Sequence, residues 1–175
     1  MGFIIGILTA AGLVTAVTIH ILTFYPDSSV TSDHPLFFLM HVGAIASCGA
    51  LALALRKRFG TVRPGWRDWL SIFPRWGLVL IVLAMAYTGI NFQSSFREGG
   101  TAEIRNGQYV LMSHGTFLRA LTQEEYQAAR AHVTRGFSGH WILFYLIPTL
   151  YFLFGSAVGP DAQAERRSTP SGASR

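Results

Sequence analysis

Residues 36–55 read LFFLMHVGAIASCGALALAL, a stretch without a charged residue that is followed directly by Arg56, Lys57 and Arg58. At 1.5 Å of rise per residue, a helix of this length crosses about 30 Å of hydrocarbon. Charged residues are also scarce over the whole chain: 50% of the 175 residues are apolar and 13% are charged. An ordinary soluble domain is about 25% charged. The sequence therefore predicts an integral membrane protein.

Three further stretches also lack Lys, Arg, Asp and Glu: residues 3–25, 76–92 and 141–158. With their flanks, the predicted spans are 3–25, 36–55, 75–92 and 139–158, which gives an all-α bundle of four transmembrane helices within residues 1–160. The first span has no basic segment before it and is too long for a signal peptide, so we expect it to be retained. Residues 161–175 have no apolar run and are expected to be a disordered tail.

Basic residues in the connections predict the orientation of the spans. The link from the first span to the second holds no Lys or Arg. The link from the second to the third is rich in them: Arg56, Lys57, Arg58, Arg63, Arg67 and Arg75. We therefore expect this second link and both termini to be cytoplasmic, in the inner membrane of a bacterium.

A short amphipathic helix is predicted within this second link. Trp66, Trp69, Leu70 and Phe73 recur at helical spacing, with charged residues between them. Such a helix is expected to lie in the membrane interface.

The third connection, residues 93–137, is expected to form a small cap on the outer ends of the helices. Asn106-Gly107 is a strong hairpin signal because both residues accept positive φ, and a two-residue turn there pairs Ile104 with Tyr109. The cap is too small to hold a soluble active site of its own.

A helix is predicted to begin at Thr122, because Thr122 and Glu125 have the spacing of a capping box. Gly136 and Gly139 are expected to permit a bend between this cap helix and the fourth span.

Small residues in the second span predict close helix packing. Gly43 with Ser47, and Ala46 with Ala50, are four residues apart and let helix backbones approach each other in lipid. We therefore expect the second span to be the central one.

Three histidines are expected at a similar depth near the outer ends of the spans: His20, His41 and His140. Ionisable residues inside a membrane often mark functional positions, and imidazole is a common ligand for haem iron, copper and zinc. They are the candidate cofactor-binding residues, with haem b or a transition metal as the cofactor. Two alternatives stay open, namely structural histidines that bond neighbouring groups, and a quinone or lipid contact. Tyr87 and Asn91 could add polar contacts at that level.

Four helices with histidines near one face resemble the membrane b-type cytochromes in that arrangement. No haem-binding motif extends over the chain, so no family is assigned from the sequence.

Several enzyme classes are not expected, and no catalytic residue is predicted. No acidic residue lies inside a span, as a proton-coupled exporter would need. We also expect no membrane Ser–His pair with a glycine-flanked nucleophile, and none of the His-rich motifs of di-iron or zinc enzymes. With Cys48 as the single cysteine, the chain cannot form an intrachain disulfide.

The sequence thus favours a non-enzymatic accessory or assembly subunit of a membrane complex. Its partners would be the lipid bilayer and a membrane protein or a second copy of the chain. Nucleic acid is not expected, since the basic residues do not gather on one soluble face. The alternatives are a haem- or metal-binding redox protein that uses the three histidines, and a lipid- or quinone-binding protein.

Overall fold

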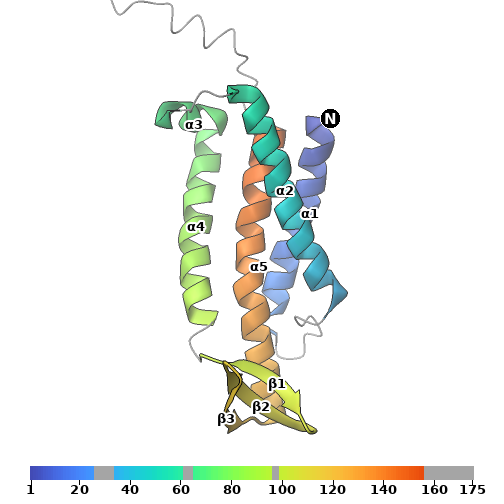
Figure 1. Ribbon diagram of the computed structural model, residues 1–175. Coiled ribbons are helices and arrows are strands. Elements are labelled where there is room, and N and C mark those ends of the chain that lie inside the picture. The colour runs from blue at the N-terminus through green and yellow to red at the C-terminus, as the bar shows by residue number, and fades with distance from the viewer. Residues whose placement is uncertain (26–33, 61–64, 96–98, 156–175) are drawn as a thin grey trace, which may run out of the picture.

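The computed structural model describes residues 1–25, 34–60, 65–95 and 99–155. It is mostly helical, with one small sheet (Figure 1). The elements in chain order are α1 (Gly2–Leu22), α2 (Pro35–Phe59), α3 (Trp66–Ile72), α4 (Arg75–Ser95), β1 (Thr101–Arg105), β2 (Gln108–Ser113), β3 (Thr116–Ala120) and α5 (Gln123–Phe154).

Helices α1, α2, α4 and α5 are long and apolar enough to cross a membrane, and the four predicted spans fall on them. The predicted amphipathic helix is present as α3. The tail predicted at residues 161–175 lies outside the described residues.

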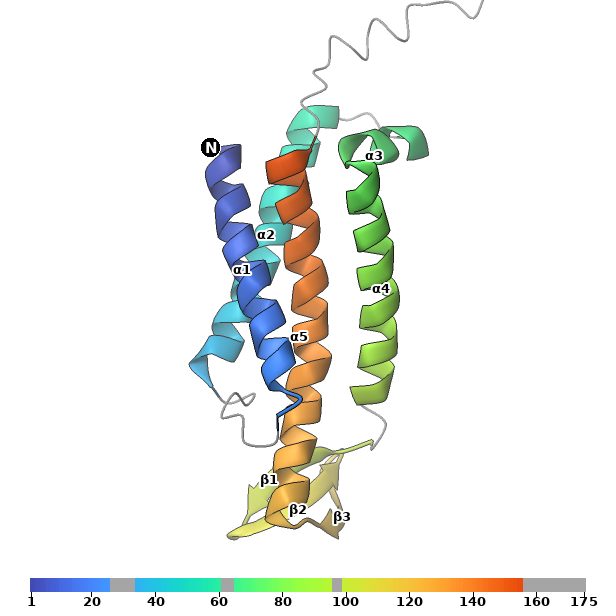
Figure 2. The same cartoon turned by 180° about the vertical axis from the view of Figure 1, so that it is seen from behind.

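Helix α5 lies at the centre of the bundle. It packs against α1, α4 and α2, whereas α2 contacts α5 and, less extensively, α1. Figures 1 and 2 show α4 on one side of α5, with α1 and α2 on the other. The expectation that the second span is central is therefore wrong. The reason is that α2 buries a single stripe (Met40, Ala44 and Ser47), while buried residues lie on several faces of α5.

Tyr145 joins three of the helices by filling space that two glycines leave open. A Cβ atom on Gly12 of α1 would come within 2.6 Å of Tyr145 Cδ1, and one on Gly43 of α2 would clash with the Tyr145 hydroxyl. That hydroxyl donates a hydrogen bond to the Met40 carbonyl at 3.1 Å. Tyr145 is buried with Ala16, Ile19, Met40, Ala44 and Trp141 in the core of the bundle. The small residues of α2 thus allow close packing, but against α5.

The cap contains the predicted hairpin and one more strand. Ile104 pairs with Tyr109, and Asn106 and Gly107 have φ values of 49° and 77°, which confirms the predicted turn. The third strand was not predicted. It follows a second tight turn, in which His114 and Gly115 also have positive φ (48° and 83°).

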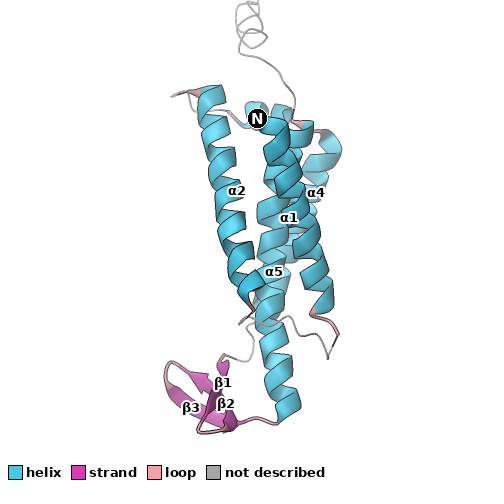
Figure 3. Cartoon of the chain, turned by 90° about the vertical axis from the view of Figure 1, so that its right-hand side faces the viewer, coloured by secondary structure: helices cyan, strands magenta, loops and turns pink. Residues whose placement is uncertain are grey.

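The strands pair antiparallel in the order β1-β2-β3. Figure 3 shows this sheet beyond the ends of the other helices, beside the extended end of α5. We call this end of the bundle the sheet end.

Helix α5 begins as predicted. The Thr122 hydroxyl accepts from the Glu125 backbone N–H at 3.1 Å, and the Glu125 carboxylate accepts from the Thr122 N–H at 2.8 Å. The hydrogen bond from the Thr122 backbone N–H, together with a second one from the Arg119 guanidinium, lowers the pKa of the Glu125 carboxyl group.

The predicted bend between a cap helix and the fourth span is wrong, because α5 is one helix of 32 residues. Gly136 and Gly139 are buried inside it. A Cβ atom on Gly139 would clash with the side-chain amide of Asn91 in α4. This glycine therefore serves a close contact between helices, and the backbone continues through it without a break.

Replacing Gly12 by Ala should destabilise the bundle by about 1–3 kcal/mol, the usual cost of overpacking a core. The added methyl would press on the Tyr145 ring, which is held in place by its hydrogen bond to Met40. Gly49→Ala is the matched control, because no atom lies within 4 Å of a Cβ at that position. Unfolding in detergent micelles, followed by circular dichroism, measures both variants. Equal stability of the two would contradict the packing described for Tyr145.

Candidate functional site

His20 is buried where α1, α4 and α5 meet near the sheet end. Its Nδ1 lies 2.8 Å from the Ser138 hydroxyl, and its Nε2 is hydrogen-bonded to the Tyr87 hydroxyl. Ser138 in turn donates to the Arg135 carbonyl at 3.1 Å. One set of proton positions satisfies every partner: Nδ1–H donates to Ser138, and Tyr87 donates to Nε2. Both ring nitrogens of His20 are therefore occupied.

Arg135 of α5 contacts Thr23 and Phe24, the residues that directly follow α1. Its Nε donates to the Thr23 hydroxyl at 3.2 Å, and a second guanidinium N–H donates to the Thr23 carbonyl. The guanidinium carbon lies 4.0 Å from the centre of the Phe24 ring, a cation–π contact. Thr23 also donates to the His20 carbonyl at 2.6 Å, so this contact continues into the histidine network.

Besides Tyr87, helix α4 contributes two further polar side chains to the same network. The Asn91 amide donates to the Arg135 carbonyl at 2.9 Å, and the Thr88 hydroxyl donates to the Gly139 carbonyl at 3.1 Å. Tyr87 and Asn91 thus do supply polar contacts at this level. We call His20, Ser138, Tyr87, Arg135, Thr23, Asn91 and Thr88 the polar network.

The other two predicted histidines share a different site. His41 of α2 and His140 of α5 line a cavity of about 190 Å³, together with Ala44, Ile45, Phe92, Phe137, Trp141 and Phe144. Each donates Nδ1–H to the backbone carbonyl four residues earlier, His41 to Phe37 at 3.0 Å and His140 to Gly136 at 2.8 Å. A carbonyl only accepts, so in the neutral ring Nε2 carries the free lone pair.

This histidine cavity is open on one side, since three of the residues that line it are exposed: Ile45, Phe92 and Phe144. A cavity of about 150 Å³ holds one benzene molecule. The lining atoms here are almost all apolar, and the volume of about 190 Å³ suits one small ring or a short hydrocarbon.

The structure thus brings His41 and His140 together and leaves His20 in the polar network. Among the described residues, no group of three or more His, Cys, Asp or Glu side chains is arranged to hold a metal ion. Cofactor binding by His20, His41 and His140 stays a prediction.

The expectation that the chain has no glycine-flanked serine paired with a histidine is wrong. Ser138 lies in the sequence Gly136-Phe137-Ser138-Gly139, and its hydroxyl contacts His20. The glycine pattern, together with a histidine at similar depth in the first span, was the signal for this pair.

The buried position of Ser138 does not suit a nucleophile. Its side chain has 0% exposure, and its hydroxyl already donates to a backbone carbonyl of α5. The surrounding N–H groups lie inside the helix, where they bond the carbonyls one turn earlier. In this structure the Ser–His pair holds helices together.

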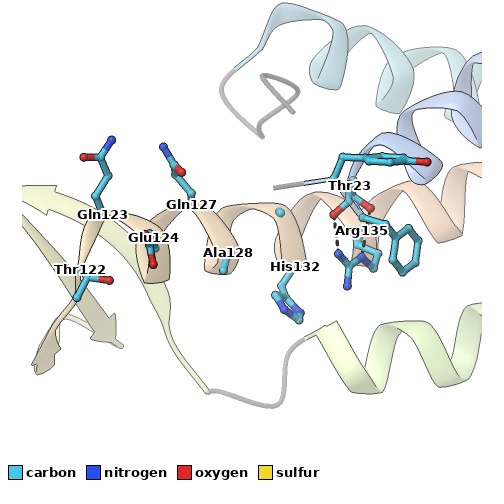
Figure 4. Close-up of a pocket in the computed structure, with 11 residues that line it drawn as sticks. Thr23, Thr122, Gln123, Glu124, Gln127, Ala128, His132 and Arg135 are labelled. Carbon is cyan, nitrogen blue, oxygen red and sulfur yellow. Dashed lines mark hydrogen bonds between the residues drawn. The ribbon is translucent and has the colours of Figure 1, made fainter. Parts of the chain in front are cut away.

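A larger hollow of about 1030 Å³ opens between the end of α1 and the part of α5 that extends beyond it (Figure 4). Its wall includes Thr23 and Phe24, which directly follow α1, and Glu124, His132 and Arg135 from α5. Figure 4 shows Arg135 reaching the end of α1, with His132 one turn nearer the sheet on the same helix. That these residues surround one space was not predicted, because they come from segments more than 95 residues apart in the chain.

No protein-family model, curated protein or solved structure matches this chain.

Replacing His20 by Phe should lower the free energy of unfolding by about 0.5–1.5 kcal/mol for each hydrogen bond lost, since Ser138 keeps its bond to the Arg135 carbonyl and Tyr87 is partly exposed. The ring volume is kept, while the bonds to Ser138 and Tyr87 are lost. Thr15→Val on the same helix is the control, because Thr15 bonds only the Ala11 carbonyl of its own helix. Denaturant titration in micelles measures both. A His20→Phe variant as stable as Thr15→Val would show that the network contributes nothing.

Proposed function

We propose that this chain is a non-enzymatic membrane protein, an accessory or assembly subunit that contacts its partner through the sheet. In this proposal the four apolar helices span the inner membrane of a bacterium. The basic link after α2 lies in the cytoplasm, and the sheet lies on the outer side. The N-terminus and the last turn of α5 lie together at the end away from the sheet (Figures 1 and 2), so both would face the cytoplasm.

The main support for the proposal is the exposed edge of the sheet. All five residues of β3 are exposed, including Phe117 at 57% and Leu118 at 48%. No strand pairs with the outer edge of β3 within the described residues. Such an edge presents unpaired backbone N–H and C=O groups, which readily pair with an added strand. Exposed aromatic and leucine side chains beside it offer the apolar contact that a bound segment needs.

The rest of the cap supports a rigid binding surface. Val110, Leu111 and Met112 of the central strand are buried, and α5 packs against β1 and β2. The capping box and the ion pair between Arg119 and Glu125, at 2.8 Å, connect β3 to the start of α5. A partner bound at β3 would thus be coupled directly to the central helix.

A photo-crosslinking amino acid at Phe117 should give one protein adduct of fixed mass in native membranes. The same amino acid at Ile104, which is 58% exposed on β1 near the other edge, is the matched control and should give much less. Leu118→Asp should abolish the Phe117 adduct, because a carboxylate cannot be buried in an apolar contact without cost. Gel electrophoresis and mass spectrometry of the adduct measure the result.

An adduct with twice the mass of the chain would identify the partner as a second copy. Adducts with lipid alone at Phe117 would overturn the proposal, since the sheet would then lie on the membrane surface.

A second candidate function, a redox protein, is favoured by one observation on His41 and His140. Both rings line one cavity, and both keep Nε2 free by donating Nδ1–H to a carbonyl. Histidine ligands of metals commonly show this second hydrogen bond. In this candidate, haem b or a transition metal would bind there.

An absorption spectrum of gently purified protein, oxidised and then reduced with dithionite, tests this second candidate. A Soret band, or a stoichiometric metal, should disappear in both His41→Ala and His140→Ala and remain in His34→Ala, an exposed histidine outside the cavity. A cofactor content that is equal in all three variants would overturn it.

A further inference from the structure

The hollow beside Arg135 has the features of an anion site. Arg135 has five N–H donors. Thr23 takes two of them, and no acceptor among the described residues contacts the others. Nη1, which carries two of these remaining donors, is not buried, since it has no partner within the described residues and is not among the enclosed atoms that lack one. Because Arg135 lines the hollow, these two donors are open to it.

The guanidinium is held in place before any ligand arrives. The hydrogen bonds to Thr23 fix one edge, and the Phe24 ring covers one face. A planar guanidinium fixed in this way can donate two parallel hydrogen bonds to the oxygens of a phosphate group. Less side-chain entropy is then lost on binding.

No carboxylate neutralises Arg135 within the described residues. The ion pairs there are Arg105 with Glu103 and Arg119 with Glu125, both on the cap. Glu124 also lines the hollow, but it lies eleven residues from Arg135 along α5, about 16 Å at 1.5 Å per residue. His132, one turn away from Arg135, offers a further donor.

The position of the hollow indicates the carrier of the phosphate. Helix α1 ends at Leu22, just before Thr23, and Arg135 is the last charged residue of α5, because the rest of this helix to Phe154 holds no Lys, Arg, Asp or Glu. In the membrane position proposed above, on which this step rests, that level is the headgroup layer. We infer that the hollow binds a phosphate group through Arg135, and that a phospholipid headgroup supplies it.

Native mass spectrometry of the full chain in micelles, titrated with phosphatidylglycerol, tests the inference. The lipid should remain bound, and diacylglycerol, which has the same chains without the phosphate, should bind at least tenfold more weakly. Arg135→Gln should reduce phosphatidylglycerol binding by a similar factor. Arg105→Gln, an exposed arginine on β1 outside the hollow, removes the same charge and should bind as the native chain does.

A second pair of variants leaves the contacts of Arg135 with α1 intact. Ala128 lines the hollow and is exposed on α5. Ala128→Glu adds a negative charge there and should weaken binding severalfold by repulsion. Ala128→Gln has the same size without the charge and should have little effect.

Several results would overturn the inference. One is equal binding of phosphatidylglycerol and diacylglycerol. Another is native binding by both Arg135→Gln and Ala128→Glu. If inorganic phosphate protects the chain against thermal unfolding while phosphatidylglycerol does not bind, the phosphate site stands and its lipid source is overturned. Membrane insertion, measured by extraction of membranes with carbonate, is a separate readout, so failure of this site and failure of the proposed membrane position are distinguishable.

Discussion

Close approach of α5 to three other helices is the constraint on which the structure depends. In a bundle of apolar helices, association depends on van der Waals contact and on hydrogen bonds between helices. Gly12 and Gly43 leave room for the Tyr145 ring, and Gly139 leaves room for the Asn91 amide. A side chain at any of these positions would push α5 away from a neighbour. The glycines therefore determine which helix is central.

The polar network determines how the packed helices are rotated about their own axes. Apolar contacts alone tolerate rotation of a helix about its axis, whereas hydrogen bonds require particular side chains to meet. His20 bonds α5 and α4 at the same time, and Asn91 and Thr88 bond carbonyls of α5. Each buried group in such a network costs free energy if it loses its partner, which disfavours other rotations. The network thus fixes the orientation of α5, and with it the positions of His41, His140 and the sheet.

Continuity of α5 links the bundle to the cap. One helix runs from the capping box at Thr122 past Arg135 and on through Pro148, so the sheet and the bundle share a single rigid element. The hollow exists because α5 extends beyond the end of α1 (Figure 4). A separate cap helix, bent at Gly136 and Gly139, would have placed Arg135 and His132 elsewhere. The candidate phosphate site and the exposed β3 edge both follow from this continuity.

Features that depend on local chemistry could be predicted from the amino-acid sequence. These are the four apolar helices, the turn at Asn106-Gly107 with its pairing of Ile104 and Tyr109, and the helix start at Thr122. Each depends on residues a few positions apart, where propensity, turn geometry and hydrophobicity act directly.

Four other features arise only when the helices pack together: α5 is central, α5 continues through its glycines, His20 bonds Ser138, and His41 and His140 share a cavity. These outcomes depend on which faces of distant helices meet. A glycine looks the same in the sequence whether it bends a helix or admits a neighbour, and a histidine near the end of a span can face any of three helices. The choice is made by the shapes and hydrogen-bonding groups of the surfaces that pack together.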